Sequence, residues 1–425
     1  MIPEICDIVV IGGGPGGSLA ATYLAQAGYH VVLLEKQRHP RYTVGESLIP
    51  DFWKYCDEAG VSERIVAEKF VEKAGGIIEW NGKIQRVSFK DFGFERPALH
   101  VERDRFDTIL FDNAREKGAS LFEEITVSHI VFANEVFADK QHIIHYHGTA
   151  SNEKGTTRCR YVIDASGQNS VIGRQLQLRK MDADFRFMSI WGYFRNSDYL
   201  ALNGEIHPPA DLSTILPTTY VTNLPELGDW GWSWHIMLRE HASVGLIVPI
   251  EAVKQVRQGD DSWEQFFLDR CAHLSMLSRL LMPATLVPNS VRLTRNYSYR
   301  STKIAGPGYF LIGDAAGFID PIFSVGIVLA MFGAYAAAWA IDNCIQEPDR
   351  AETYQEIYST QVQRRLELGK ALALPGYAKQ VIHNHQAQEI VKLTSDQSQA
   401  FMHIASLVTA RSHNFDALLP TATEE

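Results

Sequence analysis

A glycine-rich turn near the start of the chain lies between two apolar segments and constrains the fold more than any other feature. It reads Gly12-Gly13-Gly14-Pro15-Gly16-Gly17 and follows an apolar, β-branched stretch over Cys6–Ile11. In the spacing Gly-x-Gly-x-x-Gly, the first glycine permits a tight turn, the second lets the backbone approach a pyrophosphate, and the third lets a helix pack against the strand. A second apolar stretch, His30–Glu35, ends in an acid 18 residues beyond Gly17 that can accept hydrogen bonds from a ribose. The sequence therefore predicts a Rossmann-like unit with a dinucleotide at the helix N-terminus.

Composition narrows the class of protein. Apolar residues make up 46% and charged residues 21% of the 425 residues, which is globular usage and excludes a disordered chain. The formal net charge of −10 argues against non-specific nucleic-acid binding and against a polybasic membrane anchor. The five cysteines include no CxxC pair, and His383-Asn384-His385 has no third ligand at a suitable spacing, so no metal site is expected. These features, with no signal peptide expected, fit a cytoplasmic enzyme or binding protein.

The order of apolar segments predicts an α/β fold. Short apolar runs indicate buried parallel strands at Tyr161–Asp164 and Tyr309–Ile312, in addition to the two that flank the first helix. The segment 183–295 is rich in Trp, Tyr and Pro and is interpreted as an antiparallel sheet that covers a pocket. Further strands are expected at Lys73–Lys90, Val127–Ile144, Phe187–Phe194, Trp230–Leu238 and Ala242–Pro249, and further helices at Phe52–Lys69, Asp104–Lys117 and from Arg350 to about Ser412.

An uncharged stretch, Pro321–Ile341, has about the length of a membrane span. Pro321, Ser324 and Gly326 break the run and leave about 16 helical residues, which is short for a span. Many of these residues are alanine or glycine, which suits close packing inside a protein. We therefore expect a buried helix over Gly326–Ile341 and no membrane span.

Three segments resemble the FAD-dependent family that includes aromatic hydroxylases and flavin-dependent halogenases. Val101-Glu102-Arg103-Asp104-Arg105-Phe106-Asp107 is similar to the segment whose arginine, here Arg103, reaches the cofactor. Asp164-Ala165-Ser166-Gly167 is similar to the central strand and turn of the family. Gly313-Asp314-Ala315-Ala316-Gly317 is similar to its second FAD motif, whose aspartate binds ribityl or ribose hydroxyls. The resemblance implies FAD rather than NAD, and a helix from Gly326 whose N-terminus points at the flavin.

The motif order and the resemblance together predict interleaved domains. A discontinuous GR2-type FAD-binding domain comprises residues 1–72, 96–182 and 296–345, a substrate-binding sheet comprises 73–95 and 183–295, and a helical region comprises 346–425. The residues expected to bind the cofactor are Gly12, Gly14, Pro15, Gly17, Glu35, Lys36, Arg41, Ser47, Arg103, Asp314, Gly326 and Ile327.

Within that family, three features resemble the flavin-dependent halogenases of the phenol and pyrrole type. The Gly45-Glu46-Ser47 core of the segment 41–50 is similar to a halogenase segment beside the flavin. The segment 70–76 is similar to the one that holds the catalytic lysine, which matches Lys73. Trp232-Ser233-Trp234-His235-Ile236 is similar to the signature W-x-W-x-I-P between flavin and substrate. The residues that this implies for catalysis are Lys73, Glu46, Trp232 and Trp234.

The resemblance also implies a mechanism. Reduced FAD, O2 and a halide give hypohalous acid, which a lysine amine holds by a hydrogen bond or as a haloamine beside an electron-rich ring. The chloride or bromide ion would sit against the backbone at Ser324, Val325, Gly326 and Ile327, where a helix N-terminus favours an anion. A separate flavin reductase would supply reduced FAD, since the chain holds one dinucleotide fingerprint. The substrate would be a phenol or pyrrole, in one version tethered to a carrier protein that docks near Arg364-Arg365.

Other interpretations of these residues stay open. Lys73 could be a solvated surface lysine, the two tryptophans could be core residues, and Glu46 could be a structural carboxylate. Met237 stands where the signature has proline, and Val325 stands where many halogenases have serine. These two departures keep open an FAD-dependent monooxygenase or another oxidoreductase on a halogenase-like scaffold. An isoprenoid reductase of the same FAD superfamily is a third hypothesis, and Lys73 and the Gly45-Glu46-Ser47 segment favour a halogenase over it.

Overall fold

A largely parallel sheet forms one half of the molecule. The computed structural model describes residues 1–133, 141–183, 185–224, 226, 231–256, 262–378 and 415–419. The strands of this sheet are β1 (Ile8–Ile11), β2 (Val31–Leu34), β7 (Ser120–Phe122), β11 (Tyr161–Asp164), β22 (Ala305–Gly306) and β23 (Tyr309–Leu311). They lie in the order β22-β23-β11-β1-β2-β7, with β22 antiparallel to β23 and the other neighbours parallel. Strands β1, β2 and β11 are buried along their whole length, as expected for parallel strands covered on both faces.

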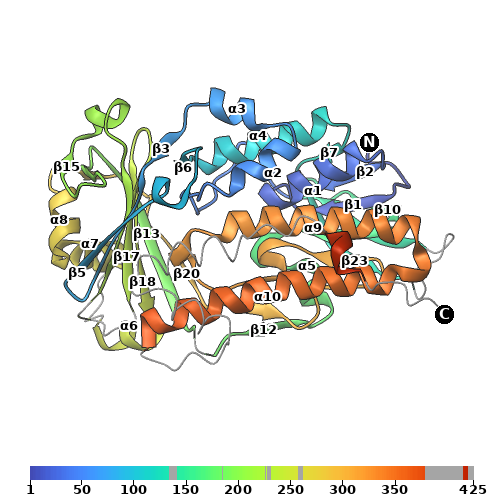
Figure 1. Ribbon diagram of the computed structural model, residues 1–425. Coiled ribbons are helices and arrows are strands. Elements are labelled where there is room, and N and C mark those ends of the chain that lie inside the picture. Colours follow the sequence, from blue (N-terminus) through green and yellow to red (C-terminus); the bar gives the residue numbers. More distant parts are fainter. Residues whose placement is uncertain are drawn as a thin grey trace.

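Helices pack around this sheet. Helix α9 contacts α1, α2 and α10, and Figure 1 shows α9 and α10 running side by side. The helices are α1 (Pro15–Gln26), α2 (Phe52–Glu58), α3 (Ser62–Ala67), α4 (Arg103–Glu116), α5 (Val171–Gln175), α6 (Ile250–Val256), α7 (Trp263–His273), α8 (Ser275–Leu280), α9 (Gly326–Gln346) and α10 (Ala351–Ala378).

A second, larger sheet faces the N-terminus of α9 and stands at the left of Figure 1. Its strands are β4 (Gly75–Trp80), β5 (Lys83–Ser88), β13 (Phe187–Arg195), β16 (Thr218–Asn223), β17 (Trp232–Met237), β18 (Ala242–Pro249), β19 (Thr285–Leu286) and β20 (Arg292–Arg295). Their order is β19-β13-β18-β17-β16-β4-β5, and β20 also pairs with β13. Because strand side chains alternate, β17 presents Trp232, Trp234 and Ile236 to one core and Met237 to the other, where α7 and α8 pack.

Smaller pairings complete the described part of the fold. They are β3 (Val71–Lys73) with β6 (Ala98–His100), β8 (Ile125–Val131) with β9 (His142–Gly148) and β10 (Lys154–Cys159), β12 (Arg179–Met181) with β21 (Tyr299–Ser301) and β24 (Gly317–Phe318), and β14 (Tyr199–Leu200) with β15 (Ile206–His207). The predicted fold class, a Rossmann-like α/β half combined with a second sheet and a C-terminal helix, is confirmed. The residue boundaries of the domains stay a prediction.

Several expected elements differ from those observed. The helix expected over Phe52–Lys69 is two helices, because Gly60 adopts a φ of +67° between them. The second sheet is not wholly antiparallel, since β4 runs parallel to β16. These two strands come from distant parts of the chain, so no hairpin turn fixes their relative direction. Strand β16 and helices α6, α7 and α8 were not predicted, and Trp230 lies outside the described residues.

The apolar helix α9 is longer than expected. It has 21 residues rather than about 16, because it continues through Asp342 to Gln346. The argument from length against a membrane span was therefore wrong, and this helix is long and apolar enough to cross a membrane by length and composition alone. Its packing gives the better description, because 61% of its most apolar window is buried against other parts of the protein. The helix α10 that follows confirms part of the helical region, while His383-Asn384-His385 and the expected helix beyond residue 378 lie outside the described residues.

Candidate functional site

The glycine-rich turn adopts the geometry that its spacing predicts. Gly12 has a φ of +102°, and a Cβ built on Gly17 would lie 1.9 Å from the carbonyl oxygen of Gly12. Neither position tolerates a side chain, because the first needs a left-handed backbone and the second a bare Cα. Helix α1 begins directly after the turn, with Gly14 as its N-cap and Pro15 in its first turn, and no side chain caps its N–H groups. This end of the helix can therefore donate hydrogen bonds to a phosphate.

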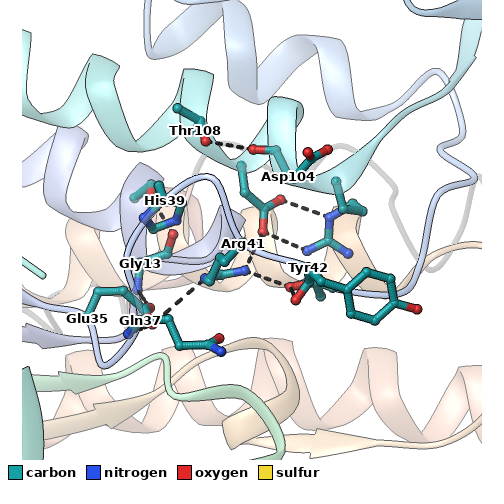
Figure 2. Close-up of polar contacts among 12 residues, drawn as sticks. Gly13, Glu35, Gln37, His39, Arg41, Tyr42, Asp104 and Thr108 are labelled. Carbon is teal, nitrogen blue, oxygen red and sulfur yellow. Dashed lines mark hydrogen bonds and ion pairs between the residues drawn. The ribbon is translucent and has the colours of Figure 1, made fainter. Parts of the chain in front are cut away.

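Glu35 closes the loop rather than projecting freely. One of its carboxylate oxygens accepts a hydrogen bond from the Gly13 N–H at 2.7 Å, and the other accepts one from the Gln37 N–H at 2.9 Å (Figure 2). Its side chain is buried but still lines the large cavity described below. The acid thus fixes the glycine turn and the chain after β2 in one arrangement. Binding to a ribose stays a prediction for this residue.

Two arginines share one buried carboxylate. Arg103 makes a two-pronged contact with Asp107 at 2.8 and 3.0 Å, and Arg41 lies 3.1 Å from the same carboxylate. Arg103 also donates to the carbonyl oxygen of Val44, so it holds the Gly45-Glu46-Ser47 segment in place. Sequence reasoning named both arginines but missed Asp107. The Arg103–Asp107 spacing of four residues on a helix was the signal that could have identified the pair.

One large cavity lies between the two halves of the molecule. Its volume is about 990 Å³. The glycine turn lines one part of it, and strands of the second sheet line another. Most of the predicted site residues line it: Gly12, Gly14, Pro15, Glu35, Lys36, Arg41, Glu46, Ser47, Arg103, Trp232, Trp234, Asp314, Ser324, Gly326 and Ile327. Gly17, Lys73 and Val325 are not among the lining residues. A single cavity therefore joins the expected cofactor residues to most of the expected catalytic residues.

The residues that line the cavity fit FAD chemically. The nearest heavy atom to a Cβ built on Gly14 is Arg41 Nη2, at 3.5 Å, so a side chain there would occupy cavity space beside the N-terminus of α1. Asp314 also lines the cavity, and burial raises the pKa of its carboxyl to about 6, an effect that Arg103 opposes. Hydroxyl groups of a ribityl chain or a ribose would donate hydrogen bonds to this buried carboxylate.

Lys73 lies just behind the cavity wall, in a buried chain of polar groups. Its Nζ donates to Ser47 Oγ at 2.6 Å and to Thr219 Oγ1 at 3.2 Å. Ser47 and Thr219 both line the cavity, and Ser324 donates to Ser47 at 3.1 Å. The lysine is only 3% exposed, so the interpretation of Lys73 as a solvated surface residue is wrong. The structure joins the predicted lysine and the predicted halide turn through Ser47.

Burial changes the protonation of Lys73. It lowers the pKa of the amine to about 7, because the charged form loses its hydration without gaining a carboxylate partner. A large fraction of the amine is therefore neutral at neutral pH. A neutral amine has a lone pair and can act as a nucleophile, whereas the ammonium form cannot.

This shift predicts a pH dependence of stability. The unfolded chain has the ordinary lysine pKa near 10.4, so between about pH 7 and pH 10 the unfolded state binds more protons than the folded state. The free energy of unfolding contributed by Lys73 then rises with pH in that window, by at most about 1.4 kcal/mol per pH unit. Urea unfolding of wild type and Lys73→Met between pH 7 and pH 9 should show a smaller rise in the variant. The exposed Lys90→Met serves as the control, and equal slopes for wild type and Lys73→Met would contradict the burial effect.

Glu46 is a buried carboxylate held by a tyrosine. Its Oε1 accepts a hydrogen bond from Tyr193 at 2.6 Å, and its Oε2 accepts one from the Gly45 N–H at 3.1 Å. Burial raises the pKa of Glu46, and the Tyr193 hydrogen bond opposes that rise. Tyr193 was missed in the sequence, which offered no motif for it. Glu46 therefore combines a structural role with a place on the cavity wall.

The two tryptophans of β17 stand side by side on the cavity face of the sheet. Their ring centroids are 5.8 Å apart, and both rings are buried. Trp234 lies over Gly245 on the neighbouring strand, where a Cβ would approach the indole ring to 2.2 Å. Met237 and Val325, the two departures from the halogenase pattern, point elsewhere: Met237 belongs to the second core, and Val325 lines a small separate cavity.

The turn before α9 presents backbone to the cavity. Ser324 adopts a left-handed backbone, with a φ of +56°, and Gly326 and Ile327 form the first turn of α9. The N–H of Leu329 donates to the carbonyl oxygen of Val325, the residue that precedes α9. The N–H groups of Gly326 and Ile327 precede that bond, so they have no acceptor within the helix. Their position suits an anion, which is the predicted halide site.

Comparison with known proteins agrees with this geometry. The family model described as an FAD binding domain matches residues 5–368. A tryptophan 2-halogenase from Chondromyces crocatus is 34% identical over 363 residues, which cover 84% of this chain and 66% of the relative. A flavin-dependent halogenase, gsfI, from Penicillium aethiopicum is 32% identical over 368 residues, covering 81% of this chain and 66% of the relative. The chain thus spans just under two thirds of the length of these relatives.

The chain is also similar to a solved halogenase structure. The myxobacterial chondrochloren halogenase CndH, described as a new variant of FAD-dependent halogenases, superposes with a TM-score of 0.78 at 25% identity. The superposition covers 96% of this chain and 97% of that one. The chain belongs to the FAD-binding domain family, and its relatives place it among the flavin-dependent halogenases.

Proposed function

We propose that the protein is an FADH2-dependent halogenase of electron-rich aromatic compounds. The observation that carries the proposal is the position of Lys73, a buried amine bonded to two side chains of the wall that faces the FAD-binding turn. Its relatives in sequence carry the name of halogenases, and one of them is named for tryptophan, whose indole is an electron-rich aromatic ring. Phenols and pyrroles have the same electronic character and remain the proposed substrate class.

When bound, reduced FAD with O2 supplies the oxidising power: FADH2, O2, a halide ion and a proton give FAD, water and hypohalous acid. The N–H groups of Gly326 and Ile327 would hold the halide at the positive end of α9. The neutral amine of Lys73 would then bind the hypohalous acid or form a haloamine with release of water. In the haloamine route, the ring carbon would take the halogen and its proton would return to the nitrogen of Lys73. In the hydrogen-bonded route, that proton would leave with the hydroxide of the hypohalous acid as water.

The sheet would control where this electrophile goes. Trp232 and Trp234 form a continuous apolar wall that excludes bulk water from the cavity between the FAD turn and β17. Glu46, held by Tyr193 at Oε1 and by the Gly45 N–H at Oε2, would serve as a buried acceptor for a proton in the cavity. These side chains would therefore confine hypohalous acid near Lys73.

The remaining partners are proposals of the same kind. A separate reductase supplies reduced FAD, and the protein works in the cytoplasm on a free or carrier-bound substrate.

The basic patch predicted for carrier docking, Arg364-Arg365, was wrong in part. Arg365 is only 6% exposed, and its guanidinium packs 3.8 Å from the ring centroid of Phe332. Arg364 is the exposed residue of the pair. The alternative hypothesis of a monooxygenase depended on Met237 and Val325, the two departures from the halogenase pattern. Their side chains lie away from the large cavity, which favours the halogenase.

The test uses chemically reduced FAD, O2, bromide and an electron-rich phenol as probe, with brominated phenol measured by mass spectrometry. We expect brominated probe in proportion to flavin oxidised, and none when bromide is omitted. Complete oxidation of the flavin without brominated probe would contradict the halogenase proposal. Rapid reduction of the bound flavin by NADPH alone would contradict the requirement for a separate reductase.

A further inference from the structure

His100 and Thr219 form a buried hydrogen-bonded chain that ends at Lys73. We propose that they are positioning residues, which direct the hydrogen bonds around Lys73 so that the lone pair of its amine stays available. The inference rests on the proposed function of Lys73. Neither residue belongs to a motif identified in the sequence. His100 lies on β6, the strand that pairs with β3, and Thr219 lies on β16, which is far from both in the sequence.

The backbone of residue 237 determines which atoms donate along this series of hydrogen bonds. His100 Nδ1 lies 3.0 Å from the carbonyl oxygen of Met237, and a carbonyl can only accept. Nδ1 therefore carries a proton. Burial holds the pKa of His100 well below its ordinary value, and the neighbouring Lys73 and His235 act in the same direction, so the ring is neutral. Its Nε2 is then an acceptor.

The tautomer of His100 determines what Thr219 can do. Thr219 Oγ1 lies 2.9 Å from His100 Nε2, and it must donate its single proton there. Toward Lys73 at 3.2 Å and Ser47 at 3.1 Å the same oxygen can only accept. Ser47 in turn donates to Thr219 and accepts from Lys73 and Ser324. Every hydroxyl proton in the chain points away from the lysine.

Lys73 is therefore surrounded by acceptors. A neutral amine has two N–H bonds, and the contacts to Ser47 and Thr219 use both of them. The lone pair meets no hydroxyl proton from this chain. If Thr219 could rotate, its proton would bond to the lone pair and compete with hypohalous acid. His100 prevents that rotation, and the carbonyl of residue 237 fixes His100 whether that residue is methionine or proline.

Two substitutions disturb the orientation of these hydrogen bonds in different ways. Thr219→Val deletes the hydroxyl, so Lys73 loses an acceptor that stabilises its charged form, and its pKa should fall below the wild-type value. Ser47 also loses the acceptor of its proton, which becomes free to bond to the lone pair of the amine. His100→Leu frees the Thr219 proton to bond the amine lone pair, which also lowers the pKa of Lys73 and blocks its nucleophilic site. Each variant should lower the yield of brominated phenol per flavin oxidised by about tenfold, the usual effect of one hydrogen bond.

Conservative variants separate positioning from packing. Thr219→Ser keeps the hydroxyl, and His100→Gln keeps an acceptor at the end of the side chain, so both should retain the yield and the pKa of Lys73. The matched control is Thr218→Val, because Thr218 lies on the same strand but bonds to the carbonyl of Leu200 instead. This control should leave both measurements unchanged.

The experiment measures two quantities in the FAD-loaded full chain: the yield of brominated phenol per flavin oxidised, and the pKa of Lys73 from ¹⁵N NMR of labelled lysine, assigned with Lys73→Met. Lower pKa and yield in Thr219→Val and His100→Leu, restored in Thr219→Ser and His100→Gln, support the proposal. Wild-type values in the first two variants, or equal losses in all four, overturn it. A wild type that binds FAD but makes no brominated phenol would refute the proposed function, while the pKa comparison would still decide the positioning role.

Discussion

Replacing Lys73 with methionine is expected to lower aromatic halogenation at least about 100-fold, while the reduced flavin is still oxidised by O2 at close to the wild-type rate. The reason is that Lys73 and the residues expected to bind FAD occupy different places in the structure. Lys73 lies behind Ser47 and Thr219, outside the lining of the FAD-binding cavity, so its loss does not alter the glycine turn or the start of α9. Methionine is similar in length and apolar, so the buried position is filled.

Lys73→Arg distinguishes nucleophilic chemistry from charge. Arginine keeps a cation and hydrogen-bond donors but has no neutral form at accessible pH, so we expect this variant to be as inactive as Lys73→Met. Flavin oxidation is followed by stopped-flow absorbance and brominated phenol by mass spectrometry in the same reaction. Lys90→Met, at an exposed position, controls for the loss of a lysine. Halogenation by Lys73→Arg at the wild-type rate would remove the amine lone pair from the mechanism.

Replacing Gly14 with valine is expected to weaken FAD binding at least about 100-fold, which corresponds to about 2.7 kcal/mol. A Cβ at this position clears its nearest neighbour, Arg41 Nη2, at 3.5 Å, and Gly14 lines the cavity, so we expect the fold to accommodate a side chain that extends into the cavity. The branched side chain instead fills space beside the N-terminus of α1, where the pyrophosphate would lie. The loss should therefore fall on the cofactor and not on the fold.

Gly17→Ala provides the contrast. Its new methyl group would lie 1.9 Å from the Gly12 carbonyl oxygen, so β1 and α1 would have to separate. We expect Gly17→Ala to lower the melting temperature of the FAD-free protein, whereas Gly14→Val leaves it close to wild type. Affinity is measured by fluorescence titration of FAD and stability by thermal unfolding. Tight FAD binding by Gly14→Val would mean that the cofactor does not approach this turn.

The sequence predicted best those elements whose signal is local. Tyr161–Asp164 and Ala242–Pro249 form strands with the predicted bounds, because continuous apolar runs between turn residues have few alternatives. The glycine turn and the carboxylate of Glu35 were identified for the same reason, since their spacing is fixed by one strand–helix–strand unit. Most predicted site residues line one cavity, because three motifs distant in sequence follow strands at the same edge of the sheets.

What the sequence did not predict depends on contacts between distant segments. The residues Thr218–Asn223 are mostly β-branched or aromatic, which was a usable strand signal, but their parallel pairing with β4 has no local cause. Thr219 and His100 reach Lys73 only through that pairing and through the pairing of β3 with β6. The burial of Arg365 similarly results from the packing of α10 on α9. A threonine or histidine outside any motif carries no sign of such a role.

The strand order of the first sheet has a consequence for how the chain is made. Strand β11 has β1 on one side and β23 on the other, and β23 comes from residues Tyr309–Leu311. During synthesis the ribosome releases the chain from its N-terminus, so β11 must wait for about 150 further residues before its second edge is paired. In that interval an apolar strand edge is open to other chains. Shortened forms that end before residue 309 would therefore aggregate rather than yield an isolated flavin domain.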